Sequence, residues 1–438
     1  MENYIYLLYA TEMLFIIISY YLTNRNILSP SFISFCMFFL ATSCVMVNLD
    51  FWDVSYSFET FLLVLCGFLT MLLPELLVIY FEKLRHKTYK TKKYIINTEN
   101  SPITIDKILL LGMICLSITS VIIMFYDVFF INSNYSSAGL NSIGIIKHSE
   151  EGLSILSRLA NRIAWILLIV SLYVVVYNVS IGRKLTSYNY KEFIPIIMAF
   201  VAIFISGNRM ALVKVFGMIY VFYITFNINY ANKKENISLY KVFKKFSLLG
   251  TFVVLLFYLL RGITKVNSTA AERDFVDYIT YYIGSPVYLL DKFLLTFNEL
   301  YYSDRPFGSM TFSSLYNMVG YEIDYYNFYI YVGGQSGFAG NEFSWFQRPL
   351  VDFGVFGMFL FTFVIYFVFS LILYRYVLYK RSIMATIIYG YYFYIFLTSF
   401  YYCQTTFALS FNNILYISIA YILLRLIKIT RVRSCYYE

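Results

Sequence analysis

Charge is scarce in this sequence. Asp, Glu, Lys and Arg make up 13% of its 438 residues, while 60% are hydrophobic. A typical soluble domain has about 25% charged and about 45–50% apolar residues. Histidine occurs only twice, at His86 and His148, which excludes a metal centre built from several histidines. This composition excludes an ordinary soluble domain and indicates an integral membrane protein.

Several common site patterns are also missing from the sequence. The six cysteines have no metal-like spacing, so we expect neither a disulfide framework nor a zinc site, and no other metal site. The chain has no phosphate-binding glycine loop, no H-E-x-x-H and no G-x-S-x-G, which disfavours nucleotide hydrolysis and serine hydrolase chemistry. The net charge of +9 comes mainly from basic loops between apolar segments, so it does not indicate a nucleic-acid partner.

Long apolar segments recur along the whole chain with short polar breaks between them. Each is close to the roughly 20 residues that an α-helix needs to cross the hydrocarbon layer. We therefore predict an all-α, polytopic membrane protein with about 11 transmembrane helices and one large extracytoplasmic loop. The predicted segments are 4–22, 31–49, 59–80, 107–127, 161–179, 193–206, 210–228, 246–262, 354–374, 384–402 and 412–428.

Basic residues indicate how the chain is oriented, because loops rich in Lys and Arg remain cytoplasmic. An outward-facing amino terminus places five basic stretches inside, and we predict that orientation. It divides the chain into residues 1–262 with helices one to eight, a large outer loop at 263–353, and residues 354–438 with the last three helices and a basic cytoplasmic tail. Within the loop, 276–297 predicts one or two amphipathic helices, broken near Gly284 and lying on the outer surface.

Two arginines stand at the outer ends of predicted helices. Arg209 lies in the turn "SGNR", and Arg261 ends the run "LLGTFVVLLFYLLRG". An arginine at such a position can be an interface anchor whose guanidinium reaches the headgroups. The planar guanidinium also suits phosphate, and a pair of arginines can clamp a pyrophosphate. Lys214 lies about 140° around the helix from Arg209, so we do not expect it in the same site.

These features resemble a known family. The resemblance is based on Gly207-Asn208-Arg209 at an outer turn, Arg261, the large outer loop, and the passage "GGQSGFAGNEFSWFQRPLVDFGVFGMFLF". Together they resemble the Wzy-type oligosaccharide repeat-unit polymerases, which make O-antigen and capsular polysaccharide. The resemblance implies a GT-C-like membrane glycosyltransferase of the bacterial cytoplasmic membrane. Such an enzyme joins undecaprenyl-pyrophosphate-linked oligosaccharides at the outer face, needs no cofactor, and has membrane lipid and a chain-length regulator protein as partners.

The resemblance also implies roles for particular residues. Cations would stabilise the departing pyrophosphate, and a carboxylate or imidazole would take the proton of the acceptor hydroxyl. We expect pyrophosphate binding by Arg209, Arg261, Arg273 and Arg348. Glu342 is the leading catalytic base, followed by Glu272, Asp274 and His148. The segment 325–345 by itself places aromatic faces next to an amide and a carboxylate, a combination that suits carbohydrate binding. The expected glycan-binding residues are Tyr325, Tyr326, Tyr329, Asn341 and Trp345.

Other interpretations remain open at this point. A lipid-carrier-dependent glycan ligase would share the same arginines and outer loop. A lipid-linked oligosaccharide flippase or another transporter would also need many helices and buried cations, although such a carrier favours charges near the midplane in paired halves. Glu12 and Glu75 lie within predicted helices, where carboxylates are rare, and we expect internal partners or a polar cavity around them.

Overall fold

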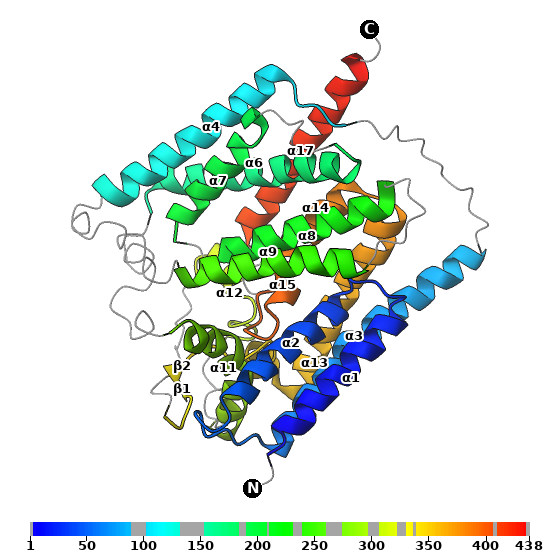
Figure 1. Cartoon of the computed structure of the whole chain (residues 1–438), viewed down its shortest axis with the longest axis vertical. Helices are drawn as coiled ribbons and strands as arrows, with labels where there is room; N and C mark the ends of the chain where they lie inside the picture. Colours follow the sequence, from blue (N-terminus) through cyan, green and yellow to red (C-terminus); the bar gives the residue numbers. More distant parts are fainter. Residues whose placement is uncertain are drawn as a thin grey trace. The chain divides into compact units, whose positions relative to one another are not determined.

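The structure of the protein is a computed structural model of the whole chain (Figure 1). It describes residues 3–88, 102–131, 153–183, 190–207, 210–230, 239–259, 274–296, 306–321, 330–335, 339–405 and 410–434. Helices dominate these ranges, and the one sheet within them is a two-stranded antiparallel ribbon of β1 (Ile330–Tyr331) and β2 (Ala339–Gly340).

Every predicted transmembrane segment overlaps a helix. These helices are α1 (Ile5–Leu22), α2 (Pro30–Val47), α3 (Phe58–Thr88), α4 (Lys107–Tyr126), α6 (Ile155–Ser180), α7 (Ile194–Ile205), α8 (Met210–Tyr230), α9 (Leu239–Leu259), α13 (Gln347–Leu371) with the π-helix η7 (Ile372–Tyr379), α14 (Ile383–Tyr392) with α15 (Tyr394–Leu397), and α17 (Phe411–Ser434). The segment predicted at 384–402 is shorter in the structure, since its helical part ends at Leu397.

Seven helices in the described part of the chain are long and apolar enough to cross a membrane. They are Ile5–Leu22, Pro30–Val47, Phe58–Arg85, Lys107–Phe130, Ile155–Ser180, Met210–Ile228 and Gln347–Tyr379. This supports the predicted all-α, multi-pass membrane fold. The apolar parts of α7, α9, α14–α15 and α17 are shorter, so the count of eleven crossings stays a prediction, as does a GT-C-like arrangement.

Local sequence explains where several of these helices begin. The Ser29 hydroxyl accepts a hydrogen bond from the Phe32 backbone N–H at 3.2 Å, and Pro30 occupies the first turn of α2. Asp106 caps α4 by accepting from the Ile108 N–H at 3.0 Å. Side-chain oxygens at these positions satisfy backbone donors that have no partner inside the helix. Proline fits the first turn because its missing N–H is not needed there.

The chain forms two compact units, each built from separate stretches. Unit 1 contains Met1–Tyr94, Asp274–Lys380 and Phe393–Phe411, and unit 2 contains Ile95–Arg273, Arg381–Tyr392 and Asn412–Glu438. The predicted division of the chain at 262 and 353 was based on which segments cross the membrane, and it stays a prediction. The two units are instead defined by contacts between residues. Unit 1 joins part of the predicted outer loop to the first three helices.

Unit 1 is a helical bundle with an aromatic core. Helix α1 packs on α2, and α3 packs on α13 (Figure 1). The Phe68 ring of α3 lies 5.1 Å from the Phe35 ring of α2, measured between centroids, and 5.6 Å from the Phe15 ring of α1. Such edge-on aromatic pairs add about 0.5–1.5 kcal/mol each to the burial of apolar area.

Helix α11 (Phe275–Thr296) corrects one sequence prediction. We predicted a break near Gly284, but the helix runs continuously through Gly284 and Pro286. It packs along α2, and a Cβ at position 284 would lie only 2.9 Å from the Cys44 Cβ and 3.1 Å from the Val45 nitrogen. The glycine therefore permits close helix packing, and that packing outweighs the weak helix preference of Gly and Pro.

Glu75 shows how unit 1 holds a carboxylate among apolar helices. Its Oε2 accepts hydrogen bonds from the Ser29 hydroxyl at 2.8 Å, the Ser31 N–H at 3.1 Å and the Ser31 hydroxyl at 2.5 Å. Its Oε1 accepts from the Tyr374 hydroxyl at 2.8 Å. The expected internal partners are therefore present, and they connect α3 to the start of α2 and to η7.

Helix α13 contains a bend at Gly354. This residue has φ +67° and ψ −175°, so the first turns from Gln347 to Phe353 leave the direction of the rest of the helix. Residues with a Cβ rarely adopt this conformation. The bend lets the short first part, which carries Arg348, point differently from the apolar part that follows.

Helix α6 is central to the packing of unit 2. This helix contacts α4, α7 and α8, and α8 also contacts α9 and α14. Asn178, buried near the end of α6, donates to the Ile103 carbonyl at 2.8 Å and accepts from the Ile103 N–H at 2.7 Å. That pair fixes the chain just before α4 begins.

Candidate functional site

One group of polar side chains in unit 1 gathers where two loops pair. The Trp345 N–H donates to the Ser399 carbonyl at 2.9 Å, and the Ser344 N–H donates to the Tyr401 carbonyl at 3.0 Å. These bonds hold the residues just before α13 against the segment that follows α15. Glu342 lies shortly before this pairing and Arg348 shortly after it, so both are carried by the same short stretch of backbone.

Arg348 lies over an aromatic ring in this group. Its guanidinium carbon is 4.7 Å from the centroid of the Tyr402 ring. Burial raises the pKa of the Tyr402 phenol well above its usual range, the negative charge of Glu342 raises it further, and the positive charge of Arg348 opposes both. Tyr402 thus lies within electrostatic reach of both charges and keeps its proton at neutral pH. We call Glu342, Arg348 and Tyr402 the arginine centre.

Two neighbours of the arginine centre have structural roles. Asp352 accepts from the Met310 N–H at 3.1 Å and from the Thr311 N–H at 2.5 Å, so its two oxygens hold a loop against α13. Cys403 lies 2.8 Å from the Thr405 hydroxyl, measured at sulfur, and burial raises the pKa of its thiol to about 11. Cys403 is therefore a neutral thiol at pH 7 and not a thiolate nucleophile.

The arginine centre combines two chemical abilities. A guanidinium donates paired hydrogen bonds to phosphate oxygens, and Arg348 is in the first turn of α13, where backbone N–H groups add positive potential. A half-buried carboxylate such as Glu342 can accept a proton. The two side chains also remain partly exposed, so a ligand can reach them.

Unit 2 contains a different cationic group, around Lys214 of α8. The Lys214 ammonium lies 5.5 Å from the Trp165 ring and 5.4 Å from the Tyr391 ring. The Tyr391 hydroxyl donates to the Asn413 side-chain oxygen at 2.6 Å. Ring faces attract a cation through their quadrupole. We call Lys214, Trp165 and Tyr391 the lysine box. Our sequence reasoning set Lys214 aside, although a lysine inside an apolar helix was itself a signal.

The structure assigns one predicted glycan-binding residue to the core. Trp345 has 0% of its surface exposed, and its indole N–H donates to the Thr362 hydroxyl at 2.9 Å. A ring buried in this way cannot stack on a sugar, so the predicted role of Trp345 is corrected to packing. Asn341 is half-buried and precedes Glu342 in sequence. Asp274 is exposed just before α11. The roles predicted for these two residues stay predictions.

All the other predicted site residues lie outside the described residues. These are Arg209, Arg261, Arg273, Glu272, His148, Tyr325, Tyr326 and Tyr329. Their proposed roles stay predictions. In the part of the chain that is described, no three His, Cys, Asp or Glu side chains gather as a metal-ion site.

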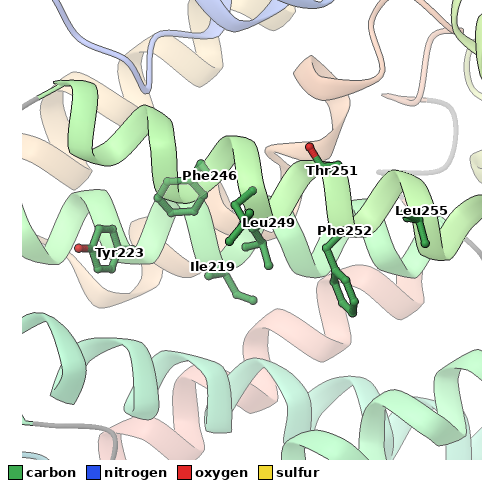
Figure 2. Close-up of a pocket in the computed structure, with 8 residues that line it drawn as sticks. Ile219, Tyr223, Phe246, Leu249, Thr251, Phe252 and Leu255 are labelled. Carbon is green, nitrogen blue, oxygen red and sulfur yellow. The ribbon is translucent and has the colours of Figure 1, made fainter.

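An apolar groove of about 620 Å³ runs between α8 and α9 in unit 2 (Figure 2). Its lining includes Ile219 and Tyr223 from α8 and Phe246 and Phe252 from α9. Almost all of the lining is carbon, which suits a hydrocarbon chain. Ile219 lies about 140° around α8 from Lys214, so the groove and the lysine box are on different faces of that helix.

No family model, no curated protein and no solved structure matches this chain.

Proposed function

We propose that the protein is a polymerase of the bacterial cytoplasmic membrane that joins undecaprenyl-pyrophosphate-linked oligosaccharide repeat units into O-antigen or capsular polysaccharide. The observation that carries the proposal is the arginine centre, because two residues with complementary predicted roles, Glu342 and Arg348, act on the same phenol of Tyr402. The multi-pass helical fold supports it, since both substrates carry long lipid chains.

The proposed reaction is a glycosyl transfer. The bond between the anomeric carbon and the pyrophosphate oxygen breaks, and a new bond forms between that carbon and a hydroxyl oxygen of the acceptor sugar. Glu342 takes the proton of the acceptor hydroxyl, and Arg348 stabilises the negative charge that develops on the departing lipid pyrophosphate. Tyr402 keeps the guanidinium in position through its ring face.

A ladder of glycan lengths tests this function. Cells that lack the gene should carry a single repeat unit on their surface, and the wild-type gene should restore the ladder. Arg348→Ala and Arg209→Ala should restore no ladder although the protein reaches the membrane at normal levels. Arg425→Ala is the matched control, because Arg425 also lies over a tyrosine ring, at 5.4 Å from Tyr421, but on an exposed part of α17.

The ladder also separates the competing functions. If deletion removes even the single repeat unit from the surface, a flippase or a ligase explains the protein better. A normal ladder from Arg348→Ala would remove the arginine centre from the reaction.

A further inference from the structure

Apart from Glu75, unit 1 buries two more carboxylates, Glu12 and Asp291, away from the arginine centre. Glu12 of α1 is 0% exposed, and its Oε1 accepts from the Thr42 hydroxyl at 2.9 Å. Its other oxygen, Oε2, is buried and has no hydrogen-bond partner among the described residues. A carboxylate left half-satisfied inside a helical bundle is costly, so something must compensate it.

Asp291 of α11 is the second carboxylate, and it is also 0% exposed. Its Oδ1 accepts from the Ser57 N–H at 2.9 Å, the Ser57 hydroxyl at 2.5 Å and the Thr60 hydroxyl at 2.7 Å. These three bonds place Asp291 at the first turn of α3. Its Oδ2, like the Glu12 Oε2, is buried without a hydrogen-bond partner in the described part of the chain.

Tyr56 brings a third buried oxygen to these two acids. Only 1% of Tyr56 is exposed, and its hydroxyl has no hydrogen-bond partner among the described residues. Burial raises the pKa of Tyr56 well above its usual range, and the negative charges of Asp291 and Glu12 raise it further. The Tyr4 N–H donates to the Tyr56 carbonyl at 3.1 Å, which holds Tyr56 against the start of α1, the helix that carries Glu12. Tyr56 also lies near Asp291, because the next residue, Ser57, donates a hydrogen bond to the Asp291 carboxylate.

No basic side chain compensates these acids by an ion pair. Within the described ranges, neither Glu12 nor Asp291 forms an ion pair with a Lys, Arg or His side chain. Burial of an unpaired carboxylate costs several kcal/mol. A proton on the carboxyl group or a bound cation removes that cost, and oxygen ligands from carboxylates and hydroxyls are what hard cations such as Na⁺, Mg²⁺ and Ca²⁺ prefer.

We propose that Glu12, Tyr56 and Asp291 form a buried site for a small hard cation that joins α1, the start of α3 and α11. The free oxygens are Glu12 Oε2, Tyr56 Oη and Asp291 Oδ2. The hydroxyls of Thr42, Ser57 and Thr60 donate to the other oxygen of each carboxylate and so orient it. The site is independent of the arginine centre and does not rest on the proposed polymerase activity.

Thermal unfolding of the purified full-length protein in detergent tests this site. Tm is measured in Na⁺, Mg²⁺ or Ca²⁺ chloride against choline chloride at equal ionic strength, because choline is too large for a buried site. We expect at least one small cation to raise Tm of the wild type by several degrees in a saturable manner. Glu12→Gln and Asp291→Asn should lose this rise. Tyr56→Phe, which keeps the ring, should weaken the apparent affinity about tenfold or more.

Glu75→Gln is the matched control. Glu75 is equally buried, but both of its oxygens already accept hydrogen bonds. This variant should lower Tm in every salt and keep the cation-dependent rise. Two results would overturn the proposal: a wild-type Tm that is the same in choline and in all three small cations, or a rise that persists unchanged in Tyr56→Phe and in whichever of the two acid variants folds.

Discussion

The arginine centre and the lysine box hold their cations in different surroundings. In unit 1, Arg348 shares Tyr402 with the carboxylate of Glu342 and has Asp352 one turn further along α13. In unit 2, Lys214 lies over the faces of Trp165 and Tyr391 within an apolar helix. A cation beside a carboxylate offers both charge stabilisation and proton transfer. A cation over aromatic faces offers charge stabilisation. This difference makes the arginine centre the stronger candidate for chemistry.

The largest expected effect is at Glu342. Because general base catalysis contributes about 10²–10⁴-fold, we expect Glu342→Gln to lower the rate of glycan transfer by a factor in that range. The measurement is the rate of polymer formation from purified lipid-linked repeat units by the protein in detergent. Glu342→Asp should recover part of the rate. Asp352→Asn is the matched control: it should lower Tm, since Asp352 holds the 310–311 backbone, and change the rate far less.

At Arg348 we expect an effect of similar or slightly smaller size. Removal of one group that stabilises charge in the transition state costs about 10²–10³ in rate, so Arg348→Ala should slow the same purified reaction by that much. Arg348→Lys should rescue it only partly, because an ammonium cannot form the paired hydrogen bonds of a guanidinium. Full activity of Arg348→Lys would show that charge alone is sufficient there.

Lys214 should show a smaller effect, which sharpens the contrast between the two groups. Contact of a desolvated cation with aromatic faces is worth about 2 kcal/mol. We therefore expect Lys214→Met, which keeps the apolar stem, to shorten the glycan ladder without abolishing it. Complete loss of the ladder at normal protein levels would give the lysine box a direct part in the reaction and would break the proposed contrast.

The smallest effect is expected on stability, at the bend that orients Arg348. Because Gly354 has φ +67° and open space around it, Gly354→Ala should cost about 1–3 kcal/mol through backbone strain alone. Thermal unfolding measures this change. Gly112→Ala is the control, since Gly112 also has open space but lies within α4, where alanine should stabilise by about 1 kcal/mol. Equal shifts at the two positions would argue against strain at Gly354.

The positions of the helices were predictable because each apolar segment must satisfy its own backbone hydrogen bonds in lipid. The eleven predicted segments all fall on helices for this reason. The course of α11 was not predictable from local propensity. Gly284 and Pro286 suggested a break, but contact of Gly284 with Cys44 and Val45 stabilises a continuous helix. That contact joins residues distant in sequence, and no local pattern encodes it.

The candidate site was predictable only in part. Glu342 and Arg348 are close in sequence, so their proximity needed little tertiary information. Tyr402 was missed because it joins them through pairing of residues 344–345 with 399–401. Trp345 was assigned to glycan because the sequence cannot distinguish an interfacial tryptophan from a buried one. Lys214 was set aside because it lies about 140° around the helix from Arg209. Only the folded chain brings Trp165 and Tyr391 around it.

By itself, the sequence determined that this is a helical protein of the membrane with few charges, because hydrocarbon excludes other backbone arrangements and most ionised side chains. Only the tertiary structure decided which side chains surround each of those charges. Glu75 has hydrogen-bond partners from the start of α2 and from η7. Glu12 has one from α2, and its second oxygen has none in the described part of the chain. The physical reason is that a buried charge is stabilised by the atoms packed against it, and those atoms come from distant parts of the chain.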